Sequence, residues 1–227
     1  MGLIYPGVPK KLTTELAKKY SIKQFVETGT QYGITSIWAA AHFDHVITIE
    51  ASEVLFKEVN PKLSKYSNIE HVFGDSSTVL KKQKVGFPAL FWLDAHYSGG
   101  NTFSGENPLM KEIDFINTLG PNVFIFIDDA RFVTSKWRGE QFCLLNELIG
   151  KLKIYNRYIA IFEDVIIAVP EYAKESVDEY TDEMSEIYWE QYISKMQSER
   201  LSRMNVFMER INKKLSSIFN SLIKKKY

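Results

Sequence analysis

Short apolar runs alternate with amphipathic stretches along the chain from Ser21 to about Pro170. The apolar runs are Gln24–Glu27, Val46–Glu50, Ile69–Phe73, Ala89–Asp94, Val123–Asp128, Tyr158–Phe162 and Val165–Val169. The amphipathic stretches, which we predict to be helices, are Thr35–His42, Glu53–Lys65, Ser77–Lys82, Pro108–Leu119 and Gln141–Lys151. Strands that alternate with helices form a mostly parallel sheet covered on both faces. The pattern therefore predicts a seven-stranded α/β domain of the Rossmann-like kind.

The last two strands depart from this alternation. Only Glu163 and Asp164 separate the run Tyr158–Phe162 from the run Val165–Val169. Two residues are too few for a parallel crossover, so these strands must form an antiparallel hairpin. A parallel sheet that ends with an antiparallel strand differs from the ordinary dinucleotide-binding sheet.

The composition changes after Pro170, and we divide the chain into a domain at 1–170 and a helical extension at 171–227. The extension has no glycine, no further proline and no strand pattern. Its apolar residues alternate spacings of three and four, as in a coiled-coil seam: Leu201, Met204, Met208, Ile211, Leu215, Ile218 and Leu222. The stripe either packs on its own domain or pairs with a second copy to form a homodimer. A third alternative is that Lys224–Lys226 and the apolar residues beside them contact an anionic membrane surface.

Composition narrows the class of protein. The chain has 28 Lys and Arg residues and 28 Asp and Glu residues, without the basic excess of a dedicated nucleic-acid binder. Cys143 is the single cysteine, which excludes an intrachain disulfide and favours a reducing compartment. No apolar run reaches the ~18 residues of a membrane span, and the first eleven residues lack the apolar core of a signal peptide. We expect a cytoplasmic protein.

The end of the first strand is the first candidate ligand site. It reads Glu27-Thr28-Gly29-Thr30-Gln31-Tyr32-Gly33 and leads directly into a helix. Glycines let the backbone turn tightly and approach a ligand, and the N-terminus of the following helix favours a carboxylate. An ordinary strand-to-helix turn would have the same pattern.

The residues that end the next strands support the ligand-binding interpretation. Glu50 ends the second strand about twenty residues after Gly29, where a carboxylate accepts ribose hydroxyls. Asp75 and Ser76 follow the third strand, in a position to accept from an adenine amino group. Asp94 ends the fourth strand. Open α/β sheets bind ligands at this edge.

The run from Phe25 to Asp129 resembles the class I methyltransferases that use S-adenosylmethionine (SAM). The resemblance implies that Glu27, Gly29 and Gly33 form the first motif, that Thr35 lies near the methionine carboxylate, that Glu50 holds the ribose, and that Asp75 and Ser76 contact the adenine. The complete set of cofactor-binding residues that we predict is Glu27, Gly29, Thr30, Gly33, Thr35, Glu50, Ala51, Asp75, Ser76 and Asp94. The motif Gly-Thr-Gln-Tyr-Gly lacks a middle glycine, as in catechol O-methyltransferase-like members, and this counts against NAD.

Three aspartates mark a candidate reaction site. Asp94 ends the fourth strand, and Asp128 and Asp129 end the fifth, so neighbouring strands would bring them together. Clustered carboxylates repel one another unless a cation neutralises them, and hard oxygen ligands suit Mg²⁺ or Mn²⁺. We therefore predict a metal site at Asp94, Asp128 and Asp129. The alternatives are that these aspartates cap helices, or that Asp94 contacts the cofactor or acceptor without a metal.

A hydroxyl acceptor must lose its proton before it attacks the methyl group. His96 is the candidate general base because an imidazole titrates near neutral pH, and Tyr97 is a second candidate. A bound metal would lower the pKa of the acceptor oxygen. The arrangement resembles the metal-dependent O-methyltransferases of the catechol and macrolide-sugar kinds, which implies Asp94 as a catalytic residue as well.

The predicted function is SAM-dependent O-methylation, assisted by a divalent metal, of a small polar acceptor such as a saccharide or its activated or phosphorylated precursor. Arg131, Lys136 and Arg138 either bind an anionic acceptor or are solvated. One rival is a metal-dependent nucleotide hydrolase or transferase, although no Gly-x-x-x-x-Gly-Lys-Ser/Thr phosphate loop occurs. The other rival is a non-catalytic scaffold with a methyltransferase-like fold.

Overall fold

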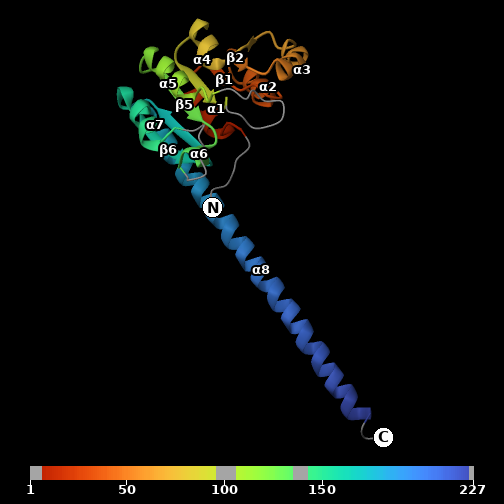
Figure 1. Cartoon of the computed structure of the whole chain (residues 1–227). Coiled ribbons are helices and arrows are strands. Elements are labelled where there is room, and N and C mark those ends of the chain that lie inside the picture. Colours follow the sequence, from red (N-terminus) through yellow and green to blue (C-terminus); the bar gives the residue numbers. More distant parts are fainter. Residues whose placement is uncertain (1–6, 96–105, 135–142, 225–227) are drawn as a thin grey trace. The chain divides into compact units, whose positions relative to one another are not determined.

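The computed structural model describes residues 7–95, 106–134 and 143–224, with side chains described up to residue 214. The chain divides into two units between Asp178 and Glu179. The first unit contains the sheet, and the second is helical throughout its described part (Figure 1).

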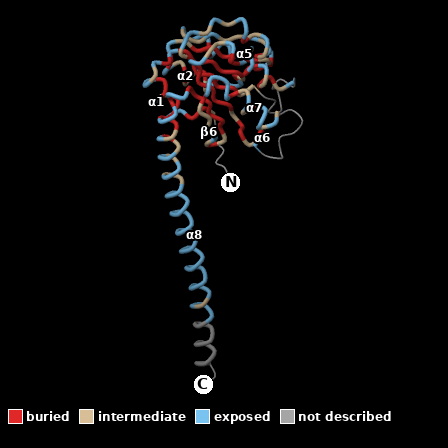
Figure 2. The backbone as a smooth tube through the Cα atoms, turned by 90° about the vertical axis from the view of Figure 1, so that its left-hand side faces the viewer, coloured by how far each residue is buried: buried red, intermediate tan, exposed pale blue. Residues whose placement is uncertain are grey.

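The first unit is built on one seven-stranded sheet with the strand order β3-β2-β1-β4-β5-β7-β6. Its strands are β1 Gln24–Thr28, β2 His45–Glu50, β3 Ile69–Phe73, β4 Ala89–Leu93, β5 Val123–Ile127, β6 Tyr158–Phe162 and β7 Val165–Val169. The first five are parallel, and β7 is antiparallel to both β5 and β6. All five residues of β4 and of β5 are buried, because helices cover both faces of the sheet (Figure 2). The sequence-based prediction of the sheet is confirmed.

Helices connect the parallel strands, as the alternating pattern predicts. The helices of this unit that precede β6 are α1 Lys10–Lys19, α2 Ile34–Ala40, α3 Glu53–Leu63, α4 Ser76–Val79, α5 Leu109–Thr118, α6 Ala130–Thr134 and α7 Leu145–Leu152. Short 3-10 turns follow α4 at Leu80–Lys82 and α7 at Ile154–Asn156. Helices α2 and α3 pack against β2 and β3, whereas α5 packs between α4 and α7. The apolar faces of α5 and α7 form one core with β4, β5 and β7.

The hairpin between β6 and β7 closes with two residues, Glu163 and Asp164, both at positive φ (51° and 67°). Two left-handed residues in succession give a turn whose twist matches that of antiparallel strands. The carbonyl of Asp164 accepts from the N–H of Ala130 (2.7 Å), and its carboxylate accepts from the N–H of Arg131 (2.8 Å). The turn therefore satisfies the first N–H groups of α6, next to the end of β5.

Two helices were missed by the hydrophobic pattern. Helix α1 buries Leu12 and Leu16 together with the polar Thr13, so its apolar stripe is narrow. Helix α6 has only five residues, too few for a periodic signal, and the turn at Asp164 stabilises its start. The predicted helix at Gln141–Lys151 begins outside the described residues, and α7 accounts for its remainder.

The chain after Pro170 is helical, as predicted: a 3-10 turn, Glu171–Ala173, leads into α8, Lys174–Lys224. Helix α8 begins in the first unit, where Val177 is buried and Lys19 donates to the hydroxyl of Ser176 (2.9 Å). In the second unit the apolar side chains that are exposed include Trp189, Tyr192, Met196, Leu201, Met204, Phe207 and Met208. Ile211 is half-buried, and the side chains of Leu215, Ile218 and Leu222 lie outside the described part. No described helix is long and apolar enough to cross a membrane.

Candidate functional site

The predicted ligand-binding residues follow β1, β2, β3 and β4, whose carboxyl ends meet at one edge of the sheet. β1 pairs with both β2 and β4, so Thr28 lies beside Ile49 on one side and beside Leu93 on the other. The first motif therefore lies between Glu50 and Asp94 in space, although these residues are distant in sequence.

Gly29 lies where the backbone after β1 closely approaches the end of β4. Its φ is +87°, and a Cβ atom built there would lie 2.4 Å from the carbonyl oxygen of Asp94. The N–H of Gly29 donates to Ile49 (2.9 Å), and the N–H of Asp94 donates to Thr28 (3.0 Å). Only glycine fits this conformation and this spacing, so the motif requires its first glycine for a structural reason.

Gly33 is the residue before α2 and also has a positive φ, +72°. A Cβ atom there would lie 2.9 Å from Val59 and 3.0 Å from Leu63, both on α3. The second glycine of the motif therefore lets the start of α2 contact α3. It is needed for helix packing, which is a different requirement from that at Gly29.

Glu27 is the centre of a buried polar network below the motif. It is 2 % exposed, and its Oε2 accepts from the hydroxyls of Ser36 and Thr48 (2.6 Å for Thr48). The Thr48 hydroxyl also lies 2.7 Å from that of Thr30. Burial raises the pKa of the Glu27 carboxyl to about 7, despite the hydrogen bonds from Ser36, Thr48 and Thr35, and the charge of Glu50 adds to the rise. Glu27, Thr30 and Thr35 therefore lie close together, and their contact with a cofactor stays a prediction.

Glu50 is 5 % exposed, and backbone donors on two loops hold its carboxylate. Oε2 accepts from the N–H of Gln31 (2.8 Å), and Oε1 accepts from the N–H of Ser52 (2.8 Å). Each carboxylate oxygen has two acceptor positions, so each retains one after these bonds as far as the described residues are concerned. A fixed carboxylate with a free acceptor position on both oxygens is suited to a pair of neighbouring hydroxyls. Ala51, next in sequence, is half-buried.

Asp75 and Ser76 differ in their surroundings. Asp75 is the N-cap of α4, and its Oδ1 accepts from both the N–H (2.8 Å) and the hydroxyl (2.6 Å) of Ser77. One of its oxygens is therefore engaged in capping the helix. Ser76 is 4 % exposed, and its hydroxyl contacts a carboxyl group that the sequence analysis did not identify.

That carboxyl belongs to Glu112, on the first turn of α5. Glu112 is 1 % exposed, on the same helix face as the buried residues Leu109, Ile113 and Ile116. Burial raises its pKa to about 7, and the charge of Asp75 adds to the rise, while the hydroxyls of Ser76 and Thr28 oppose it. The only sequence signal for Glu112 is a charged residue on the apolar face of an amphipathic helix.

The three predicted metal-binding aspartates lie within electrostatic range of one another. The pKa of Asp94 is raised well above its usual range by burial, then by the charges of Asp128 and Asp129 and, more weakly, by that of Glu27. Arg131 opposes this rise. The convergence of Asp94 with the pair after β5 follows from the pairing of β4 with β5.

One of the three aspartates predicted to bind a divalent metal pairs with a cation of this chain, and the metal site stays a prediction. Nη1 of Arg131 lies 2.6 Å from Oδ1 of Asp129 and also pairs with the carboxylate of Asp164. A guanidinium therefore neutralises Asp129, the residue expected to bind the metal. Within 7–95, 106–134 and 143–224, no three His, Cys, Asp or Glu side chains form a group suited to a metal ion. Arg131, suggested above as an anion-binding residue, has two carboxylates of this chain as its partners.

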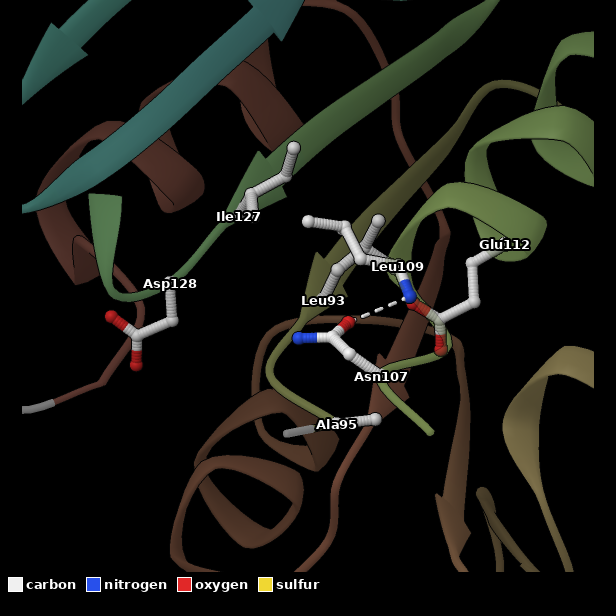
Figure 3. Close-up of a pocket in the computed structure, with 7 residues that line it drawn as sticks. All are labelled: Leu93, Ala95, Asn107, Leu109, Glu112, Ile127 and Asp128. Carbon is white, nitrogen blue, oxygen red and sulfur yellow. Dashed lines mark hydrogen bonds between the residues drawn. The ribbon is translucent and has the colours of Figure 1, made fainter. Parts of the chain in front are cut away.

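A hollow opens between the ends of β4 and β5 and the start of α5 (Figure 3). It is lined by Leu93, Ala95, Asn107, Leu109, Glu112, Ile127 and Asp128, and it holds about 230 Å³ of empty space, part of it open to solvent. Asn107 Oδ1 accepts from the N–H of Leu109 (3.0 Å), which fixes the amide at the rim. The predicted bases, His96 and Tyr97, lie outside the described residues, as do Lys136 and Arg138.

Comparison with known proteins identifies the fold. No protein-family model matches the sequence, and no curated protein sequence matches it. Among solved structures, TomG, an O-methyltransferase of Streptomyces achromogenes in complex with SAM, is 14 % identical with a TM-score of 0.51, over 74 % of this chain and 82 % of that chain. An O-methyltransferase of Bacillus cereus in complex with S-adenosylhomocysteine (SAH) is 15 % identical with a TM-score of 0.50, over 72 % and 82 %. A Staphylococcus aureus protein assigned as a caffeoyl-CoA O-methyltransferase is 18 % identical with a TM-score of 0.50, over 74 % and 86 %.

Identities this low establish the fold and no more. The likeness covers about three quarters of the chain, and the final antiparallel pair β7 and β6 belongs to the same sheet. The chain therefore has the class I SAM-dependent methyltransferase fold, as its sequence predicted.

Proposed function

We propose that the chain is a SAM-dependent O-methyltransferase that acts on a small polar acceptor. The observation that carries this proposal is Glu50, a nearly buried carboxylate at the end of β2 that the N–H groups of Gln31 and Ser52 hold in place. In our proposal Glu50 accepts hydrogen bonds from the two ribose hydroxyls.

The charges of the site support a cationic ligand. SAM, when bound, supplies a methyl group on a positively charged sulfur. Glu27, Glu50 and Asp94 gather around the first motif, and the raised pKa values of Glu27 and Asp94 reflect both burial and mutual repulsion. A ligand with positive charge would offset this repulsion, whereas a nucleoside triphosphate would increase it. The acidic site thus favours SAM over a nucleoside triphosphate as the ligand, which counts against the nucleotide hydrolase alternative.

The proposed acceptor rests on the proteins that share the fold. Three proteins with the same fold are described as O-methyltransferases, and two of them were solved with SAM or SAH. We propose transfer to a hydroxyl of a saccharide or of its activated or phosphorylated precursor, with His96 or Tyr97 as the base. Because Asp129 is paired with Arg131, we derive no step through a metal ion.

Incubation of the full chain with radiolabelled SAM and a panel of sugars, sugar phosphates, nucleotide sugars and catechols tests this function. We expect label in a hydroxyl of one acceptor class, with loss of transfer in Glu50→Gln. Parallel reactions with EDTA and with added Mg²⁺ test the metal: equal rates would remove it from the account, and a strict Mg²⁺ requirement would restore it. If SAM binds but no class accepts the methyl group, the scaffold alternative gains support.

The second unit is proposed to mediate a homodimer. Its exposed apolar residues, among them Leu201, Met204 and Met208, follow the predicted seam, and helices of this kind are stabilised by pairing. Sedimentation of the full chain should give a dimer that Met204→Lys dissociates. A monomeric wild-type chain would contradict this assignment.

A further inference from the structure

Glu112 is a buried carboxyl group that the fold itself does not explain. It lies on the apolar face of α5 and is 1 % exposed, where a charged group has a high desolvation cost. Its Oε1 makes no hydrogen bond of good geometry among the described residues, and neither does Oγ1 of Thr28, although the hydroxyls of Ser76 and Thr28 lie near enough to lower the pKa of the carboxyl. Buried polar atoms without partners are rare in proteins and require an explanation.

The residues around Glu112 indicate what kind of ligand group would pair with its carboxyl. The carboxyl contacts the hydroxyl of Ser76, a residue predicted to lie at the adenine of SAM. It also lines the hollow between β4, β5 and α5, whose walls include the apolar side chains of Leu93 and Leu109 (Figure 3). The hollow is partly open to solvent, and its apolar walls and buried carboxyl match the edge of a flat ring that carries polar atoms.

We propose that the Glu112 carboxyl group recognises the Watson–Crick edge of the adenine base of bound SAM. This inference rests on the proposed function. A neutral carboxylic acid has one O–H donor and one C=O acceptor side by side. Adenine has the complementary pair, because N1 accepts a hydrogen bond and the C6 amino group donates one.

The electrostatics of the site supply the required protonation state. Burial raises the pKa of Glu112 to about 7, so a large fraction of the group is neutral near neutral pH. An ionised carboxylate would repel the lone pair of N1. Asp75, the other carboxylate predicted at the adenine, is a poorer candidate, because its Oδ1 already accepts two hydrogen bonds from Ser77.

The 1-deaza analogue of adenine provides a sharp test, because a C–H group replaces N1 and cannot accept a hydrogen bond, while the C6 amino group remains. The experiment is calorimetric titration of the full chain with SAH and with its 1-deazaadenine analogue, which differ only at this atom. We expect wild type to bind SAH at least about tenfold more tightly, because a site built for a hydrogen-bonding pair rejects the mismatched analogue.

Two variants separate recognition from structure. Glu112→Gln has an amide N–H and C=O in place of the acid O–H and C=O, so it should keep the preference for SAH. Glu112→Leu, whose fold is checked by circular dichroism, should bind the two ligands within about threefold of each other. The wild-type preference should also weaken as pH rises above 7, and that of Glu112→Gln should not.

Each outcome decides between the proposals. An unchanged preference in Glu112→Leu overturns the inference about Glu112 while leaving SAM binding intact. If Glu112→Leu does not fold, an equal pH dependence of the preference in wild type and Glu112→Gln overturns it instead. Failure of wild type to bind either ligand refutes the proposed function, and with it this inference.

Discussion

Replacing Glu112 by Gln should change how the stability of the protein depends on pH. The pKa of Glu112 is about 7 in the folded chain, and it is 4.5 when the group is exposed to water, as in the unfolded chain. Between these values the folded state binds one more proton than the unfolded state, so the free energy of unfolding falls as pH rises. Each pKa unit corresponds to ~1.4 kcal/mol, and a difference of about 2.5 units gives a loss of about 3 kcal/mol by pH 8.5.

Glutamine is close in shape to the protonated acid and cannot ionise. Glu112→Gln should therefore have nearly the stability of wild type at pH 4.5 and exceed it by about 3 kcal/mol at pH 8.5. Urea unfolding of both proteins between these pH values, without ligand, measures the difference. Glu58→Gln, an exposed position on α3, is the matched control and should show no such trend. A difference between Glu112→Gln and wild type that stays constant with pH would refute the reasoning.

Two further predictions concern Gly29 and Arg131, which shape the backbone and the ion pairs at the site. Gly29→Ala should lower the free energy of unfolding by about 2 kcal/mol or more, because its Cβ would lie 2.4 Å from the Asp94 carbonyl at a φ of +87°. Thermal melting measures this effect, and Gly150→Ala on α7 is the control. Nothing lies within 4 Å of a Cβ atom there, so we expect the free energy of unfolding to rise by up to ~1 kcal/mol. Equal effects of the two substitutions would contradict the prediction. Arg131→Met should cost about 1 kcal/mol at pH 7, because Asp129 and Asp164 lose their shared cation. The control is Lys57→Met, which removes an exposed ion pair with Glu53. If Arg131→Met costs no more stability than Lys57→Met, the prediction is wrong.

The strands β4, β5 and β7 were predictable because their apolar runs are fully buried and bounded by turn residues. β4 and β5 have no polar residue, and the two residues between β6 and β7 allow only a hairpin. Helix α6 was not predictable, because its start depends on Asp164, which is distant in sequence and lies beside Arg131 only in the folded chain.

In the site, too, some residues could be predicted from their position in the sequence, and others depend on contacts that only the fold creates. Glu50 and Gly29 follow from their positions at strand ends, and the structure adds the N–H donors and the close approach that explain them. The metal prediction rested on three clustered aspartates and did not include Arg131, and it stays a prediction. Strand order cannot show that Arg131 pairs with Asp129, because that pairing depends on side-chain placement. Glu112 was missed because helical periodicity assigns its position to the core.

The most direct test of the central claim is calorimetric titration of the full chain with SAM, in wild type and in Glu50→Gln. The account predicts micromolar binding, of the order of −8 kcal/mol, to wild type and a loss of about tenfold or more in Glu50→Gln. Equal binding to both proteins would remove Glu50 from the cofactor site. No binding to wild type would contradict the assignment of the chain as a SAM-dependent enzyme.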